Sequence, residues 1–262
     1  MVIREQQRAL LFDILKPFRI WVGIDEVGRG CLAGPVVVAG AVPRTQLDSH
    51  VALDACYLFF DHSQGDDGSF GPIVMPNFFH SWLRETNGFK EDIMKDGSQH
   101  LYEKRKQIRD SKVLSDRQRR ALLPSIFENY VVGLALSSPN EIERTNILQA
   151  TLTSVGRVMD GFGKLLGVST EGIFCIDGNQ IVKERTVAQV ALIKGDRYFE
   201  PISAASIVAK VFRDDVMRYL SDFFPLYRFV VHKGYATSLH RKALAQWGPC
   251  VLHRRQFRGV LS

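Results

Sequence analysis

Apolar residues gather in five short runs along the chain, and each run is typical of a buried β-strand. The runs are rich in β-branched residues and are bounded by turn residues, which favours strands over helices. The first two flank a glycine-rich turn. We therefore predict strands at 21–24, 36–42, 130–136, 172–176 and 187–193.

Between and after the last of these runs, apolar residues recur every three or four positions. This spacing is the pattern of an amphipathic helix. It predicts helices over 140–158, over 203–220 with Ser203 or Ser206 as N-cap, and over 238–246, where Gly248 follows. Strands that come first and then alternate with helices predict a mixed α/β sheet with helices packed on it.

One acidic segment interrupts the pattern. Residues 45–100 include nine Asp or Glu but only three Lys or Arg. Glycine- and aspartate-rich stretches occur at 64–69 and 95–98. We expect a long surface insertion at about 44–108, ordered in part through the aromatic residues at 57–60 and 78–83. A tolerated loop is favoured over a role in controlling access of the substrate.

Composition narrows the class of protein. Apolar residues make up 45% of the chain and charged residues 24%, which are ordinary values for a globular protein. No apolar run approaches the roughly 18 residues that a membrane span needs, and residues 1–18 lack the apolar core of a signal peptide. We therefore expect a cytoplasmic protein without membrane contact. The spacing of the four cysteines disfavours a zinc site and structural disulfides, and Cys31 and Cys175 are expected to be small buried residues.

Positive charge is concentrated near the C-terminus. The net charge is +6, and no acidic residue follows Asp222. Seven basic residues do follow it: Arg228, Lys233, Arg241, Lys242, Arg254, Arg255 and Arg258. Because aromatic residues lie among these charges, a nucleic-acid partner is favoured over a merely solvated basic face.

Carboxylates stand at the carboxyl ends of three predicted strands. Asp25 and Glu26 follow the first strand, Asp177 follows the fourth and Asp196 follows the fifth. Each acid alone is equally well explained as a solvated turn residue. Four at matching positions favour a site for divalent cations, since ligands bind at this edge of open α/β sheets. We expect Mg²⁺ or Mn²⁺ in a two-metal arrangement that hydrolyses a phosphodiester.

The turn after the first two carboxylates reads Gly28-Arg29-Gly30. Glycine allows a ligand to approach the backbone closely. Arg29 between the two glycines has the reach and the charge to bind a phosphate. This turn is therefore a candidate contact for the same ligand.

In their order along the chain, these motifs resemble those of the ribonuclease HII family. Residues 23–36, Gly-Ile-Asp-Glu-Val-Gly-Arg-Gly-Cys-Leu-Ala-Gly-Pro-Val, are similar to the opening signature of that family. Further similar blocks are Asp-Ser-Lys at 110–112, the helix at 141–151, Ile-Asp-Gly-Asn at 176–179, Lys-Gly-Asp at 194–196, the stretch 202–214, His-Lys-Gly-Tyr-Ala-Thr at 232–237 and His-Arg-Arg-Gln-Phe at 253–257. The resemblance runs from about residue 20 to 258, except for the acidic segment.

The resemblance implies an α/β fold: an RNase H-like mixed five-stranded sheet flanked by helices, with a helical C-terminal part. Residues 20–262 would form this catalytic domain after an N-terminal extension at 1–19. The implied enzyme is a metal-dependent endoribonuclease, a type 2 ribonuclease H. It would cleave RNA in RNA–DNA hybrids and single ribonucleotides in duplex DNA, 5′ of the ribonucleotide, and leave 5′-phosphate and 3′-hydroxyl ends. We expect a monomer.

The resemblance also implies roles for individual residues. The implied catalytic and metal-binding residues are Asp25, Glu26, Asp177 and Asp196. Gly28, Arg29 and Gly30 would contact the ribonucleotide and sense its 2′-hydroxyl, and Tyr235 would pack against the sugar beside the scissile bond. The candidate phosphate contacts are Ser111, Lys112, Lys194 and Lys210.

Two other functions use parts of the same pattern. A non-catalytic nucleic-acid-binding module would need the basic stretch, but four carboxylates without a metal would repel phosphate. Another two-metal nuclease, such as a resolvase or an exonuclease, would share the carboxylates but not the Gly-Arg-Gly turn with Tyr235. The chain departs from the family's usual residues at Val113, Arg197 and Gln256, and its long insertion leaves the fine substrate preference open.

Overall fold

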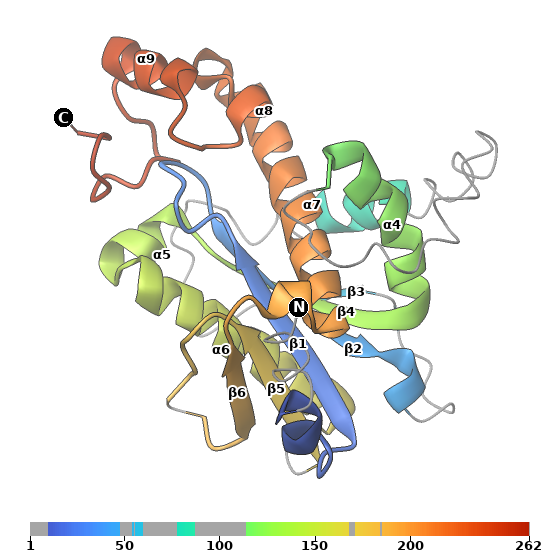
Figure 1. Ribbon diagram of the computed structural model, residues 1–262. Helices are drawn as coiled ribbons and strands as arrows, with labels where there is room; N and C mark the ends of the chain where they lie inside the picture. The colour runs from blue at the N-terminus through green and yellow to red at the C-terminus, as the bar shows by residue number, and fades with distance from the viewer. Residues whose placement is uncertain are drawn as a thin grey trace.

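Six strands form one mixed sheet in the order β3-β4-β2-β1-β5-β6 (Figure 1). The computed structural model describes residues 10–47, 54, 56–59, 78–86, 114–167, 171–183 and 185–261. The strands are β1 (Ile20–Val27), β2 (Val36–Pro43), β3 (Cys56–Leu58), β4 (Tyr130–Ser137), β5 (Gly172–Asp177) and β6 (Ala188–Leu192). β2 runs antiparallel to β1 and β4, and the other neighbouring pairs are parallel.

The mixed α/β class is confirmed, and each of the five predicted strands is present. The sixth strand, β3, was not predicted. It pairs in parallel with β4, where Cys56 lies opposite Val132, and it comes from the acidic segment. Three residues are too few to produce a recognisable alternation of apolar and polar positions.

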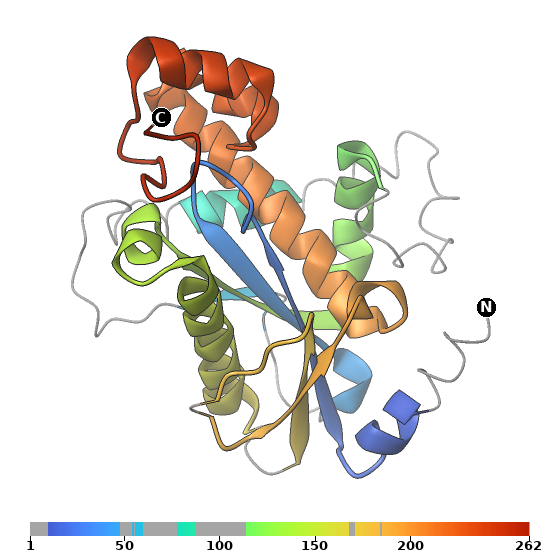
Figure 2. The same cartoon turned by 60° about the vertical axis from the view of Figure 1, so that its left-hand side comes forward.

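Helices cover both faces of the sheet (Figure 2). α6 (Ile147–Leu166) packs on one face, where Phe162 lies with Val38 and Val42. α7 (Glu200–Phe223) and α4 (Asp116–Asn129) cover the other face. Because successive side chains of β2 point to opposite faces, its almost continuous apolar run is buried on both sides.

The predicted helix at 140–158 is two helices. α5 (Pro139–Arg144) is followed by a break, and α6 begins at Ile147. Asn146 has an extended backbone, and its Oδ1 accepts a hydrogen bond from the N–H of Gln149 at 2.9 Å. This side chain caps α6, so the single apolar periodicity passes through a real helix boundary.

α7 begins at Glu200, three residues before the predicted start, so the expectation that Ser203 or Ser206 caps it is wrong. Its N-cap residue, Phe199, makes no side-chain cap. The hydroxyl of Ser203 instead donates to the carbonyl of Asp196 at 2.6 Å. A serine in the first turn therefore ties α7 to the preceding turn.

The residues after α7 form a helical layer at one end of the sheet (Figure 1). Its elements are η4 (Pro225–Tyr227), α8 (Phe229–His232) and α9 (Ser238–Trp247). The loop between β1 and β2 reaches this layer, where the Leu32 N–H donates to the carbonyl of Gly234 at 2.9 Å. The predicted helical C-terminal part is thereby joined to the sheet.

The described parts of the acidic segment contribute to the core. Residues 78–86 are helical, and Phe79 and Trp82 are buried against Phe212 of α7. The Trp82 and Phe212 rings meet edge to face at 5.0 Å, and the indole N–H donates to Asp215 at 2.9 Å. The glycine- and aspartate-rich stretches at 64–69 and 95–98 lie outside the described residues.

The N-terminal residues 10–15 are helical and pack against the sheet. Leu11 and Leu15 are buried with Cys175 and Phe199 in one apolar cluster. All four cysteines are free thiols, and Cys175 is buried, as expected of a small apolar residue. In the described part of the chain, no helix is long and apolar enough to cross a membrane. The cytoplasmic location and the monomeric state stay predictions.

Candidate metal centre and nucleic-acid surface

Two of the predicted carboxylates lie at the same level of neighbouring parallel strands. The register pairs Ile24 of β1 with Ile176 of β5, so Asp25 and Asp177 each follow by one residue. Ile24 packs on the α6 side of the sheet. Because side chains alternate along a strand, Asp25 faces the α7 side, and Asp177 does so by the same rule.

A tight turn after β6 brings Asp196 to this face. Lys194 has a left-handed backbone with φ 58°, and the Gly195 N–H donates to Oδ1 of Asp177 at 2.7 Å. A Cβ atom at Gly195 would lie 2.6 Å from Cδ1 of Ile202, so the turn has no room for a side chain there. The Lys-Gly-Asp motif therefore holds Asp177 through its backbone and presents Asp196.

Asp25, Asp177 and Asp196 each offer an oxygen, and these oxygens lie within 4.8 Å of one another. Asp25 is 3% exposed and Asp196 is 0% exposed. Asp177 is partly buried. Three negative charges this close, two of them buried, are costly unless they are compensated, and a cation would do so. All the donors are hard carboxylate oxygens, which suit Mg²⁺ or Mn²⁺. The donor set therefore fits a divalent cation.

Glu26 lies outside this group of three. The sequence had suggested that Asp25 and Glu26 follow the first strand. β1 instead continues to Val27, so both acids lie inside the strand. Adjacent strand residues point to opposite faces, and Oε1 of Glu26 forms an ion pair with Nη1 of Arg29 at 3.3 Å. The structure brings together three of the four predicted carboxylates.

The centre also affects a neighbouring phenol. Burial, and then the neighbouring Asp177 and, more weakly, Cys175 and Asp196, raise the pKa of Tyr198. Tyr198 comes directly after the 3-10 turn η3 (Gly195–Arg197) that carries Asp196. A raised pKa beside the acids is consistent with a site whose field is negative and therefore attracts cations.

The Gly-Arg-Gly turn follows the acidic strand. Gly28 has φ 96°, and a Cβ atom there would lie 2.2 Å from Nε of Arg213. Both the backbone conformation and the close packing thus require glycine. Gly30 is exposed, and a Cβ atom there would meet nothing within 4 Å. The backbone of Gly30 is therefore open to a ligand.

Tyr235 and Lys210 lie together near this turn. Nζ of Lys210 is 5.1 Å from the centre of the Tyr235 ring, and Cζ of Arg213 is 5.8 Å from it. Tyr235 is 38% exposed, so the ring is half covered by these cations and half free. Lys210 also forms an ion pair with Asp214 at 2.7 Å. Lys194 is exposed beside Asp196, whereas Ser111 and Lys112 lie outside the described residues.

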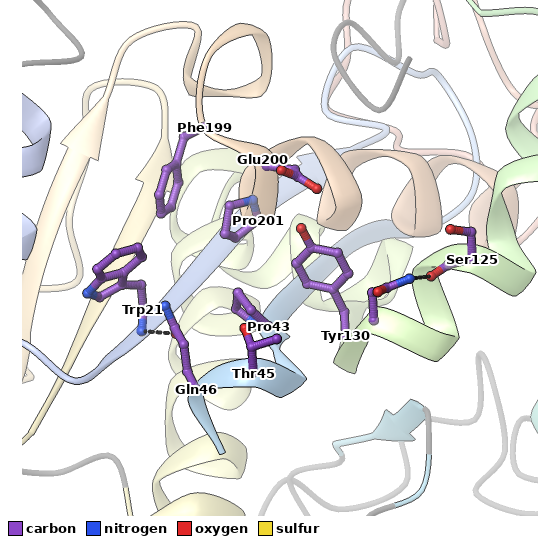
Figure 3. Close-up of a pocket in the computed structure, with 10 residues that line it drawn as sticks. Trp21, Pro43, Thr45, Gln46, Ser125, Tyr130, Phe199, Glu200 and Pro201 are labelled. Atoms are coloured by element: carbon purple, nitrogen blue, oxygen red, sulfur yellow. Dashed lines mark hydrogen bonds between the residues drawn. The ribbon is translucent and has the colours of Figure 1, made fainter. Parts of the chain in front are cut away.

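A pocket of about 390 Å³ lies near the other end of β1 (Figure 3). Its aromatic walls are Trp21, Tyr130 and Phe199, and Glu200 and Gln46 lie among its polar residues. Burial, and then the charge of Glu200, raise the pKa of Tyr130. None of the predicted site residues lines this pocket, so it is distinct from the carboxylate centre.

The chain also matches a known protein family. The sequence profile of the family described as Ribonuclease HII matches residues 22–53 and 96–260. The chain belongs to the ribonuclease HII family. The unmatched residues 54–95 fall within the predicted insertion. Membership makes the chain a type 2 ribonuclease H, an endonuclease that acts on the RNA of RNA–DNA hybrids.

Relatives and solved structures agree with this family. The ribonuclease HII of Synechococcus elongatus is 35% identical, with 94% of this chain and 89% of the relative covered. That of Thermotoga maritima is 32% identical, with 94% and 76% covered. A PCNA:RNase HII complex from Archaeoglobus fulgidus matches with TM-score 0.54 and 21% identity over 90% and 92% of the two chains. Bst-RNase HIII in complex with Mn²⁺ matches with TM-score 0.54 and 16% identity over 92% and 68%. At these identities the two structures show the shared fold.

One basic residue of this ribonuclease HII chain was misassigned. Arg254 was counted among the basic residues that favour a nucleic-acid partner, but it is 0% exposed. Its guanidinium donates to the carbonyls of Gly34 and Arg29, so it binds the protein's own backbone and does not contribute to the exposed basic surface. Of the other six, Lys233 is half-buried and the rest are exposed: Arg228, Arg241, Lys242, Arg255 and Arg258.

Sequence reasoning missed two further groups of functional interest. Arg213 is fully buried in α7 and donates to the carbonyls of Ala33 and Pro35. Three histidines cluster in the C-terminal layer: His232, His240 and His253. Arg213 precedes Asp214 and Asp215, as an exposed arginine could, so its neighbours in the sequence give no sign of burial. Histidines 8 and 13 residues apart give no sign of a shared contact.

Proposed function

We propose that the chain is a metal-dependent endonuclease that cuts on the 5′ side of a ribonucleotide. Its substrates would be RNA–DNA hybrids and duplex DNA with single embedded ribonucleotides, and its products would carry 5′-phosphate and 3′-hydroxyl ends. The observation that carries this proposal is the meeting of Asp25, Asp177 and Asp196 within 4.8 Å. Buried carboxylates in such a group are suited to ions that act on a phosphodiester.

Asp25, Asp177 and Asp196 would hold Mg²⁺ or Mn²⁺. Glu26 would be a further ligand if its side chain exchanges its ion pair with Arg29 for the ion. When bound, two such ions supply a water of lowered pKa and stabilise charge on the leaving 3′ oxygen. The chain's own task is to fix the geometry. Asp25 and Asp177 are set by the register of a sheet, and the Gly195 N–H fixes one oxygen of Asp177. Such preorganisation avoids rearrangement during the reaction.

The loop after β1 and Tyr235 would select the ribose. A 2′-hydroxyl both donates and accepts hydrogen bonds, so backbone groups at Gly28, Arg29 and Gly30 would distinguish it from a 2′-hydrogen. The half-exposed ring of Tyr235 would pack against the sugar beside the scissile bond. Open space at Gly30 and the exposed part of Tyr235 support this assignment.

Basic side chains would fix the register of the duplex. Lys194 and Lys210 lie beside Asp196 and Tyr235, at the two parts of the site, and Ser111 and Lys112 would add phosphate contacts. Arg241, Lys242 and other exposed residues of the C-terminal layer extend the positive surface. Phosphate contacts give affinity and position but do not read sequence.

The test is cleavage of a labelled duplex that carries one ribonucleotide, with Mg²⁺, with Mn²⁺ and with a chelator, beside an all-DNA duplex. We expect metal-dependent cutting only 5′ of the ribonucleotide, lost in Asp25→Asn. Equal cutting of the all-DNA duplex would leave a two-metal nuclease without ribose selection. Binding without cutting under either metal would favour the non-catalytic module.

A further inference from the structure

His253 and Arg254 are adjacent in the sequence, and both are buried against the Gly-Arg-Gly loop. A β-bridge pairs His253 with Ala33, and the N–H of Arg254 donates to the carbonyl of Leu32 at 2.9 Å. The side chains then diverge: that of Arg254 contacts the loop itself, and that of His253 contacts His240, which bonds to the carbonyl of Tyr235. The two parts of the proposed ribose site therefore meet at this dipeptide.

The side chain of Arg254 fixes the direction of one peptide unit. Nη1 donates to the carbonyl of Arg29 at 2.9 Å, while Nε and Nη2 donate to the carbonyl of Gly34 at 3.0 and 2.8 Å. In a trans peptide unit the carbonyl and the N–H point in opposite directions. Because Arg254 holds the Arg29 carbonyl on the buried side, the N–H of Gly30 points the other way, and Gly30 itself is exposed.

The side chain of His253 begins a directed chain of hydrogen bonds. Its Nδ1 accepts from the Cys250 N–H at 3.0 Å, so the ring proton is on Nε2. That Nε2–H donates to Nε2 of His240 at 3.0 Å. The proton of His240 is then on Nδ1, which donates to the carbonyl of Tyr235 at 2.9 Å. Burial lowers the pKa of both histidines to about 4, which keeps both rings neutral at pH 7.

The residue before Tyr235 is held in the same way. The Gly234 N–H donates to Nδ1 of His232 at 3.2 Å, and Nε2 of His232 donates to the carbonyl of Tyr227 at 2.8 Å. The rings of His232 and His240 stack at 4.3 Å. The backbone of Gly234 and Tyr235 is therefore bonded to histidines, not to other main-chain groups alone.

We propose that His253 and Arg254 are positioning residues for ribose selection: Arg254 aims the Gly30 N–H at the 2′-oxygen, and His253, through His240, sets the place of Tyr235. Neither side chain touches the substrate. This inference rests on the proposed function, because it assigns ribose contacts to Gly30 and Tyr235.

The first test compares His240→Asn with His240→Leu. The Asn amide occupies the place of Nδ1 and still donates to Tyr235, whereas Leu has no donor. Both variants remove the acceptor for His253, so both should lose thermal stability to a similar extent. The readout is the ratio of cleavage rates on a single-ribonucleotide duplex and on a long RNA–DNA hybrid, from which the active fraction of enzyme cancels.

We expect this ratio to fall about tenfold in His240→Leu and to stay within about twofold of wild type in His240→Asn, as for loss or retention of one hydrogen bond. An unchanged ratio in His240→Leu, or an equal fall in both variants, would overturn the role of the histidine chain. A wild-type protein that does not cut at the single ribonucleotide would instead contradict the proposed function.

The second test concerns Arg254→Lys, with Arg157→Lys as the matched control. Lysine keeps the charge but cannot bond the Arg29 and Gly34 carbonyls together. Arg157 is also largely buried and donates to a backbone carbonyl, that of Leu136, but its hydrogen-bond partners lie on β4 and α5, outside residues 28–34. The readout is the binding preference for a one-ribonucleotide duplex over all-DNA, with Ca²⁺ present and cleavage checked to be absent.

We expect Arg254→Lys to lose about tenfold in this preference and Arg157→Lys to keep it. Equal preferences in wild type and Arg254→Lys, or an equal loss in the control, would overturn the role of Arg254. Absence of any preference in the wild type would contradict ribose sensing by the loop itself. If Arg254→Lys does not fold, the His240 pair decides the inference.

Discussion

The acidic centre and the Tyr235 region are built by different means. Asp25 and Asp177 are placed by backbone pairing, because the register of two parallel strands and the alternation of their side chains put both acids on one face. Tyr235 lies in a loop, and its position depends on side chains from α7, α9 and the C-terminal segment. A substitution of a carboxylate in the acidic centre should change metal binding and catalysis but leave the backbone that positions the site, its frame, intact. A substitution in the Tyr235 region should change the frame itself.

Asp177→Asn should give the largest loss of cleavage, and it should do so without destabilising the backbone that positions the site. We expect cleavage to fall by at least about 10³-fold, since one charged ligand is lost. The amide oxygen still accepts from the Gly195 N–H, and removal of one of three close negative charges should leave the metal-free melting temperature equal or higher. Single-turnover cleavage and thermal unfolding in chelator measure the two effects. Cleavage within tenfold of wild type would contradict the proposal that Asp177 binds the catalytic ions.

Acid should weaken the Tyr235 region before the sheet. The pKa values of His240 and His253 are lowered to about 4, below the value near 6.5 of an unfolded chain. The unfolded state therefore takes up protons first as the pH falls. Stability should be full above about pH 6.5 and should decline until about pH 4, by roughly 3 kcal/mol for each of the two rings. Thermal unfolding between pH 7 and pH 4.5 measures this loss.

The control for the acid effect is His253→Leu, which removes one titrating ring. Its stability should be lower at pH 7 but should depend less on pH over the same interval. An identical pH dependence in the variant and in the wild type would assign the acid sensitivity to other groups, such as His232, whose pKa is also lowered by burial.

Lys242→Ala should give the smallest effect, because it removes one exposed charge from outside both regions. Binding to any duplex should weaken uniformly, and the slope of log K against log salt should fall by about 0.9 if Lys242 contacts a phosphate. The ratio of ribonucleotide-containing to all-DNA binding should not change. A changed ratio would mean that the basic surface takes part in selection.

The frame of the acidic centre could be predicted from the sequence because apolar runs mark strands and each acid stands at the end of one. Glu26 is the exception, and its role as a metal ligand stays a prediction. An acid at the end of an apolar run does not show whether the strand has stopped, and β1 continues through both carboxylates to Val27. Alternation inside that longer strand separates the pair.

The frame of the Tyr235 region could not be predicted in the same way. A guanidinium bonded to carbonyls at Arg29 and Gly34 is separated from them by more than 200 residues, and local sequence carries no sign of that contact. Arg254 therefore looked like one more surface charge. The family resemblance identified Tyr235 itself but not the histidines that hold its backbone. Charge patterns predict exposure only when no distant partner exists.

α7 links the two regions and fixes the distance between them. Ser203 bonds to the turn of Asp196, and seven residues later Lys210 lies over Tyr235. An ideal helix advances about 10 Å over that span, with about 100° of rotation per residue. A one-residue insertion would turn Lys210 away from the ring while leaving Ser203 in place. The phase of this helix therefore sets the spacing between the carboxylates and Tyr235.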